Sequence, residues 1–374
     1  MKIVSTGSTY RIYTDDLKTY DRLPAGVYSV QFSQLSGFSL EKHSDMTVDE
    51  KIYGVHMQKV EKIMSAYELT NRNFGVILSG AKGIGKSLFS KLLANEIINT
   101  GRPVILVKEY IGGIADFLSQ IDQDVMVLFD EFDKTYVNTS RNENDSTSPQ
   151  NELLTLFDGV EVGKKLFVVT CNELTKLNDY LVNRPGRFHY HIRFDYPTKD
   201  EIMAYMEDKL SPEYHDEIKS VVEFSHKVSL NYDCLRAIAF ELNLGTTFKE
   251  AIKDLNILNV EAERYNLTLV LTNGEKFTRR SVTLDLFDQD EDNMQTYWFS
   301  DSDDDDFYVE FHPVDAAFNI ALNGHVVSGD KVRLHWSVEK PEDPNSNEAK
   351  KYKETKVNYI LLERSYGRSI HYTV

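Results

Sequence analysis

Residues 80–87 read Gly-Ala-Lys-Gly-Ile-Gly-Lys-Ser, and this glycine loop constrains the fold more than any other stretch of the chain. An apolar run, 74–79, precedes it, and apolar residues at helical spacing follow it. In a strand–loop–helix of this kind, backbone N–H groups wrap around a phosphate at the helix N-terminus. We therefore expect nucleotide binding rather than a structural glycine turn, with Lys86 on the β- and γ-phosphates and Ser87 on Mg²⁺. The predicted contacts are Gly80, Ala81, Lys82, Gly83, Ile84, Gly85, Lys86, Ser87 and Leu88.

Two carboxylates stand at the end of a later apolar run. Residues 125–129 are all apolar and are followed by Asp130 and Glu131. Ligands of doubly wound sheets bind at the carboxyl ends of the strands, so we expect Asp130 to hold Mg²⁺ and Glu131 to activate the attacking water. A further buried strand, 166–172, has Asn172 at its polar tip, where it would hold that water or the γ-phosphate. Together these residues predict an ATPase that uses Mg²⁺ and forms ADP and phosphate.

The segment before the helix predicted from residue 55 fits two interpretations equally. Tyr53 and Gly54, in an apolar entry to this helix, could form the floor of an adenine pocket. They could equally belong to a hydrophobic staple at the helix N-terminus.

Hydrophobic periodicity divides the chain into four parts. Residues 1–44 are a small strand-rich segment, 45–198 an α/β nucleotide-binding domain, 199–258 a four-helix lid, and 259–374 a β-rich domain that begins with an Asn273-Gly274 hairpin. The stretch 285–306 holds ten acidic residues and no Lys or Arg. We interpret it as a solvated loop, with cation binding or a basic partner as alternatives.

Charge and cysteine content narrow the functional classes. The net charge of −17 argues against broad contact with nucleic acid or an anionic membrane. The two cysteines provide neither a disulfide framework nor metal-ligand spacing. Without a signal peptide or a membrane-spanning run, we expect a cytoplasmic protein.

Five motifs in order resemble a known family. The sequences GAKGIGKS, VMVLFDE, NELLTLFDG, VVTCN and NRPGRF resemble those of the AAA branch of the AAA+ ATPases, over roughly residues 50–258. The resemblance implies a P-loop domain, a parallel sheet with flanking helices that carries the Walker A and Walker B motifs, followed by the helical lid. It puts Asn172 at the sensor-1 position and makes Arg184 and Arg187 arginine fingers that reach the ATP of a neighbouring subunit. It also implies a ring, usually a hexamer.

Tyr110, Ile111 and Gly112 match the pore loop of this family, which grips a polypeptide. One departure concerns sensor 2, because Arg236 lies one helical turn later than the family's arginine. The sequences LPAGVYSV and VLFDEFDKTY are also similar to AAA ATPases of tailed bacteriophages, which would act in the host cytoplasm.

The resulting functional prediction is an ATP-hydrolysing ring that remodels or translocates a macromolecule, with protein favoured as the substrate. A DNA-handling motor or loader is one alternative, since Lys82, Lys108, Lys134 and Arg141 could line part of a basic channel. A nucleotide-switched scaffold, in which the β-rich domain binds a partner, is another.

Overall fold

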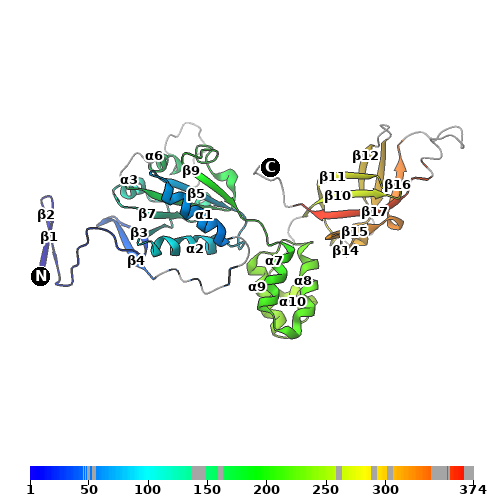
Figure 1. Cartoon of the computed structure of the whole chain (residues 1–374), viewed down its shortest axis with the longest axis horizontal. Helices are drawn as coiled ribbons and strands as arrows, with labels where there is room; N and C mark the ends of the chain where they lie inside the picture. Colours follow the sequence, from blue (N-terminus) through cyan, green and yellow to red (C-terminus); the bar gives the residue numbers. More distant parts are fainter. Residues whose placement is uncertain are drawn as a thin grey trace. The chain divides into compact units, whose positions relative to one another are not determined.

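The computed structural model describes residues 1–44, 46, 48, 51, 52, 56–136, 149–158, 163–257, 263–287, 293–300, 306–337, 352 and 354–365. The chain divides into two compact units, Met1–Asp195 and Tyr196–Val374, which are described separately (Figure 1). Within the described residues, no helix has the length and apolar character needed to cross a membrane.

The first unit is built on a seven-stranded sheet. Its strand order is β4 (Gly37–His43), β3 (Val27–Ser33), β6 (Val104–Val107), β7 (Val125–Phe129), β8 (Lys165–Cys171), β5 (Phe74–Ser79) and β9 (Phe188–Arg193). Only β4 runs antiparallel to its neighbour, and every other pair is parallel. Every residue of β5, β7 and β8 is buried, as expected of parallel strands covered on both faces. The predicted parallel α/β sheet is therefore confirmed.

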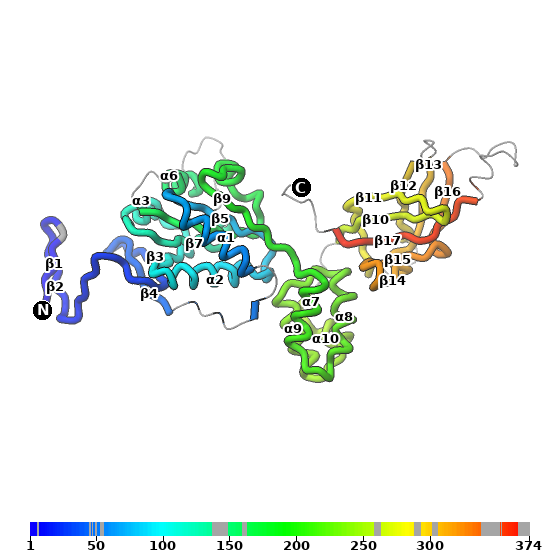
Figure 2. The backbone as a smooth tube through the Cα atoms, in the orientation of Figure 1, coloured from blue at the N-terminus to red at the C-terminus, as the bar shows by residue number. Residues whose placement is uncertain are grey.

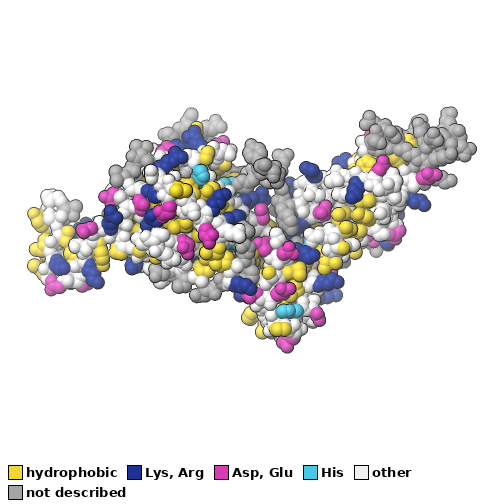
Figure 3. Space-filling view, viewed as in Figure 1, with side chains coloured by type: hydrophobic (Ala, Val, Ile, Leu, Met, Phe, Trp, Pro, Cys, Tyr) yellow, Lys and Arg dark blue, Asp and Glu magenta, His cyan; other side chains and the backbone are white. Residues whose placement is uncertain are grey.

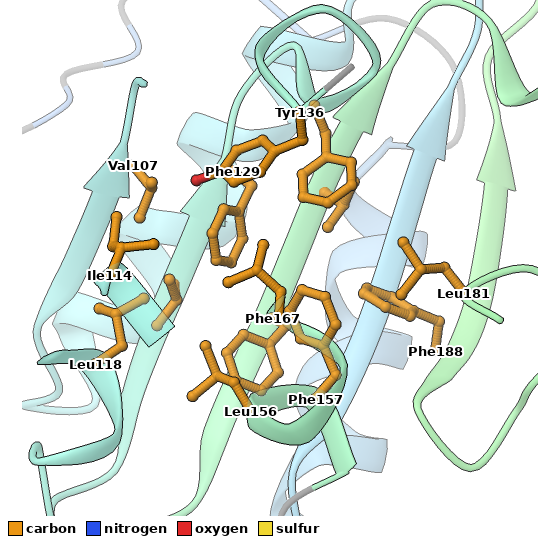
Figure 4. Close-up of a cluster of buried hydrophobic side chains, with 14 of the residues drawn as sticks. Val107, Ile114, Leu118, Phe129, Tyr136, Leu156, Phe157, Phe167, Leu181 and Phe188 are labelled. Atoms are coloured by element: carbon orange, nitrogen blue, oxygen red, sulfur yellow. The ribbon is translucent and has the colours of Figure 1, made fainter. Parts of the chain in front are cut away.

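Helices cover both faces of this sheet. On one face, α1 (His56–Leu69) and α2 (Lys86–Asn99) pack against each other (Figure 2). On the other are α3 (Ile114–Ser119), α4 (Phe132–Thr135), α5 (Pro149–Glu152) and α6 (Leu154–Asp158). The second face contains an aromatic core in which Phe129, the last residue of β7, meets Phe132, Tyr136 and Phe157 at ring-centroid distances of 5.8 Å (Figure 4). This packing fixes the end of β7 just before Asp130.

The predicted strand-rich N-terminal segment contains four strands. A hairpin of β1 (Lys2–Thr6) and β2 (Thr9–Tyr13) comes first. The strands β3 and β4 then join the main sheet, because β3 pairs in parallel with β6. Only the hairpin lies outside that sheet.

The second unit begins with the predicted helical lid. Its helices are α7 (Lys199–Lys209), α8 (Ile218–Ser225), α9 (Tyr232–Asn243) and α10 (Phe248–Asp254). Capping boxes begin α7 at Thr198 and α10 at Thr247. Between α7 and α8, residues Pro212–Glu217 form a 3-10 helix, and α8 begins at Ile218.

Two antiparallel sheets make up the β-rich region. One has the order β11 (Lys276–Leu284), β10 (Glu263–Leu271), β17 (Val357–Arg364), β15 (Gly324–Ser328) and β14 (Ala317–Asn319). The other has the order β12 (Gln295–Ser300), β13 (Asp306–Phe311) and β16 (Arg333–Trp336). The predicted hairpin is confirmed, with β10 and β11 on either side of the Asn273-Gly274 turn. The interpretation of 285–306 as one loop is wrong, because its central residues form β12, which pairs with β13.

A buried arginine joins the lid to the β-rich region within this unit. The side chain of Arg364, only 3% exposed, forms an ion pair with Glu263 of the neighbouring strand. It also donates hydrogen bonds to the carbonyl oxygen of Ser225 (2.6 Å) and to the hydroxyl of Ser229 (2.6 Å). Next to it, the Tyr265 hydroxyl donates to the carbonyl oxygen of His226 (3.2 Å). The end of α8 is therefore held by residues of β10 and β17.

We predict that Arg364→Met lowers the free energy of unfolding of this unit by about 2–3 kcal/mol, because Glu263 and the Ser225 carbonyl lose a buried donor. Both tryptophans of the chain, Trp298 and Trp336, lie in this unit, so urea unfolding followed by tryptophan fluorescence reports on it. Arg333→Met, at an exposed position of β16, is the control. Equal stability of the two variants would contradict the role assigned to Arg364.

Candidate active site

The register of three strands assembles the predicted catalytic residues. Ser79 pairs with Cys171, so the glycine loop that follows β5 lies beside Asn172. Phe129 pairs with Val169, which puts Asp130 beside Thr170. The residues that follow β5, β7 and β8 therefore converge at the carboxyl edge of the sheet, where the sequence predicts the nucleotide.

The glycine loop has the backbone conformation that its sequence predicts. Gly80, Gly83 and Gly85 have φ values of 143°, 72° and 99°, which side chains disfavour. A Cβ atom on Gly80 would also lie 2.3 Å from the carbonyl oxygen of Phe194. The loop ends at Gly85, the N-cap of α2, so that unpaired N–H groups of the first helical turn follow it.

Lys86 connects the glycine loop to the strand tip at Asn172. Its ammonium donates to the carbonyl oxygens of Gly80 (2.6 Å) and Ala81 (2.6 Å) and to Oδ1 of Asn172 (3.0 Å). Burial lowers the pKa of Lys86, while nearby acidic groups, including Asp133, Asp130 and Glu131, oppose that shift. The structure thus brings together Lys86, Asn172 and the acidic pair, as the sequence predicted.

Thr170 positions both acidic residues and was not identified from the sequence. Its hydroxyl donates to Oδ1 of Asp130 (2.7 Å) and accepts from the backbone N–H of Glu131 (2.8 Å). Glu131 has a φ of 47° and a ψ of 46°, a left-handed conformation that is unfavourable for a residue with a side chain. The bond to Thr170 holds this turn in place and directs Asp130 and Glu131 from the same strand end.

Asp133 was also missed, although it follows Glu131 by only two residues. Its carboxylate is buried, and its Oδ2 accepts from the backbone N–H groups of Asn172 and Glu173, both at 3.0 Å. Asp133 therefore fixes the tip of β8 against the turn after β7. The acidic residue was a visible signal, but its partner depends on the strand register.

The carboxylate of Glu131 forms an ion pair with Lys134, one turn further on in α4. The hydrogen bond from Lys134 is the largest cause that lowers the pKa of Glu131. Glu131 is therefore ionised near neutral pH and can accept a hydrogen bond or a proton from water.

Ser87 and Asp130 line the same pocket, together with Leu128 and Lys108. Proteins hold Mg²⁺ through one or two of their own oxygens, with phosphate oxygens and waters as the remaining ligands. A serine hydroxyl and one carboxylate fit this donor set. Within the described residues, no group of three or more His, Cys, Asp or Glu side chains could hold a metal ion by itself.

The two predicted arginine fingers differ in their surroundings. The Arg187 guanidinium is mostly buried, forms an ion pair with Asp158 through Nε and Nη2 (2.6 Å for Nη2), and donates from Nη1 to the Tyr180 carbonyl oxygen (2.8 Å). Arg184 is exposed, with its guanidinium 5.2 Å from the ring centroid of Tyr180.

The remaining predicted residues are those of the adenine pocket, the pore loop and sensor 2. Tyr53 and Gly54 lie outside the described residues. Tyr110 donates from its hydroxyl to Glu152 (2.7 Å), and its ring packs edge-on against Tyr136 at 5.6 Å. Ile111 is half-buried and Gly112 is exposed. Arg236, the sensor-2 candidate, is exposed on α9.

Comparison with known proteins supports this description of the first unit. The ATPase family associated with various cellular activities (AAA) matches residues 76–196. This part of the chain is an AAA ATPase domain. The matched span runs from the middle of β5 past the end of β9, and so contains most of the residues described above.

Curated relatives resemble the chain over this region. The 26S proteasome regulatory subunit 4 homolog of Saccharomyces cerevisiae is 30% identical over 154 residues, 37% of this chain and 35% of that protein. An AAA ATPase forming ring-shaped complexes from Corynebacterium diphtheriae is 28% identical over 203 residues, 45% of this chain and 39% of that protein. Protein mac-1 of Caenorhabditis elegans is 30% identical over 140 residues, 34% of this chain and 17% of that protein. The chain thus spans less than half the length of these relatives.

We predict that Thr170→Val lowers kcat for ATP about 10–100-fold, because the nearly isosteric side chain cannot bond Asp130 or Glu131. Thr170→Ser retains the hydroxyl and should restore most of the rate. Steady-state kinetics over a range of Mg²⁺ concentrations will separate lost metal affinity from lost turnover. An unchanged kcat in the valine variant would rule out a positioning role for Thr170.

Proposed function

We propose that this chain hydrolyses ATP to ADP and phosphate at the edge of the sheet where β5, β7 and β8 end. The observation that carries this proposal is the convergence of three groups at this edge. Lys86 bonds Asn172, and the hydroxyl of Thr170 holds the Asp130–Glu131 turn. Phosphoryl transfer requires held phosphates, a metal, an oriented water and compensation of charge, and these residue types supply each of them.

Each residue then has a distinct role. The N–H groups of residues 80–88 and the Lys86 ammonium bind the phosphates. Ser87 and Asp130 hold Mg²⁺, which neutralises charge on the phosphate oxygens. Glu131 orients the attacking water and accepts its proton, and Asn172 holds the water or the γ-phosphate. The Lys86–Asn172 hydrogen bond keeps the phosphate-binding and water-holding groups adjacent.

A second subunit completes the site in this proposal. Arg184 is exposed and available to the ATP of a neighbouring copy, whereas Arg187 is held by Asp158 and Tyr180 of its own subunit. These contacts support Arg184 as the finger with the larger effect on turnover, while Arg187 also positions the segment that carries it. The ring-shaped complexes in the name of the Corynebacterium relative support a ring, for which we propose a hexamer.

The proposed substrate of the ring is a polypeptide. The proteasome subunit among the relatives and the net charge of −17 both favour protein over nucleic acid. Tyr110, Ile111 and Gly112 would contact the substrate. The hydrogen bond from Tyr110 to Glu152 holds the tyrosine side chain against its own domain, so contact with the substrate requires this bond to break.

Mixing two inactive variants tests whether the active site is shared between two subunits. Arg184→Ala should lower kcat at least 10³-fold, as expected for loss of an arginine finger, and Lys86→Ala should remove phosphate binding. In a mixture, a Lys86→Ala copy can supply Arg184 to the intact nucleotide site of an Arg184→Ala neighbour, so turnover should partly return. Arg72→Ala, at an exposed arginine after α1, is the control. If the mixture assembles yet stays as inactive as its parts, the site is not shared.

The polypeptide proposal is tested at Tyr110 with casein as an unfolded substrate. Tyr110→Ala should abolish the stimulation of ATP turnover by casein, measured relative to the basal rate of the same variant. Tyr110→Phe retains the aromatic side chain without the hydrogen bond to Glu152 and should retain the stimulation by casein. If DNA stimulates turnover instead, with a steep salt dependence, the DNA-handling alternative is favoured.

A further inference from the structure

The N-terminal hairpin has one apolar face that is more than half exposed. Ile3 pairs directly with Ile12 across the two strands, and Tyr10 lies on the same face. These side chains are 57%, 69% and 70% exposed, respectively. The opposite face also carries hydrophobic side chains, Val4 and Tyr13, which are 37% and 38% exposed. Among the described residues, the face formed by Ile3, Tyr10 and Ile12 is therefore the more exposed of the two.

An isolated two-stranded hairpin is at best marginally stable in water, and its apolar face must pack on something to be retained. Hydrophobic side chains are visible over this hairpin at the N-terminal end of the molecule (Figure 3). The hairpin is also tied to the segment that follows it, because the ammonium of Lys2 donates to the carbonyl oxygen of Leu17 (3.0 Å). This arrangement indicates a preformed element whose apolar face binds another surface.

The same unit exposes a second apolar surface, at the tip of the β3–β4 hairpin. Phe32 is 48% exposed and Leu35 is 97% exposed. The tip is rigidly mounted, because Phe38 contacts Phe32 (4.9 Å between ring centroids) and stacks on Phe117 of α3 (5.0 Å). Within the described residues, β4 is also the last strand of its sheet, so its outer edge is open to pairing.

The segment that connects the two apolar surfaces is anchored at Leu23. The backbone of Leu23 is clamped by the Gln123 side chain, which accepts from its N–H (2.7 Å) and donates to its carbonyl oxygen (3.1 Å). Because Leu17 is bonded to the hairpin through Lys2, residues 18–22 separate the anchor from the hairpin, and five extended residues span up to about 17 Å. The hairpin can therefore reach beyond the surface of its own subunit.

We propose that the N-terminal hairpin of one copy packs its apolar face, formed by Ile3, Tyr10 and Ile12, on the β3–β4 tip of a second copy. Within the described residues of one chain neither apolar surface covers the other, but every copy carries both. Contacts between two different surfaces of identical chains run head to tail, and such contacts close into a ring when the rotation between neighbours permits it. This inference rests on the proposed ring and identifies one contact that holds it together.

Assembly of the full chain with ATP and Mg²⁺, followed by sedimentation velocity, tests the contact. Ile12→Asp puts a charge on the apolar face and should raise the concentration needed for half-assembly at least tenfold. Thr9→Asp introduces the same charge on the opposite face of β2 and should leave assembly unchanged. Equal assembly of the wild type and both variants would overturn the hairpin contact while leaving the ring in place. Failure of the wild type to assemble would overturn the ring as well.

Cross-linking identifies the surface that covers the hairpin. One tagged copy carries Ile12→Cys, a differently tagged copy carries Leu35→Cys, and a short bismaleimide is added after assembly. The proposal expects a cross-link between the two tags, and Thr9→Cys in place of Ile12→Cys should give much less. Cross-linking only within single chains of the Ile12→Cys/Leu35→Cys double variant would assign the hairpin to its own subunit. Absence of both products would assign it to another partner, and either result overturns the proposal.

Discussion

The site depends on how β8 pairs with its two neighbours. Parallel pairing of β8 with β5 and β7 aligns three strand ends at one edge of the sheet. A shift of one residue in either pairing would turn alternate side chains to the opposite face and separate Thr170 from Asp130. All three strands are buried on both faces, and the aromatic cluster around Phe129 packs against the end of β7. The packing of the core therefore sets the geometry of the polar groups at its edge.

Hydrogen bonds then hold in place the residues that the strand register brings together. Thr170 and Asp133 have no assigned contact with ATP or Mg²⁺. They instead form hydrogen bonds to Asp130, to the Glu131 backbone and to the backbone of Asn172 at the end of β8. A hydroxyl and a carboxylate are used here to hold backbone and side-chain positions. The left-handed conformation of Glu131 is unfavourable by itself and persists because these neighbours fix it.

The main sheet and the glycine loop could be predicted because their signals are local: apolar runs, glycine spacing and acids at a strand end. Thr170 and Asp133 could not, because their roles depend on which strands are neighbours. The strand β12 was missed because it lies within an acidic stretch. The junction at Arg364 joins residues 139 positions apart in sequence, a distance at which periodicity has no predictive value. It ties the predicted lid to the β-rich region in one compact unit.

The most direct test of the account is ATP turnover by Glu131→Gln. The substitution retains the size of the side chain and one acceptor oxygen but removes the carboxylate that accepts the proton from water. We predict that kcat falls about 10²–10⁴-fold while ATP still binds, because Lys86 and the glycine loop are unchanged. Turnover equal to that of the wild type, at the same level of ATP binding, would contradict the assignment of this edge of the sheet as the catalytic site.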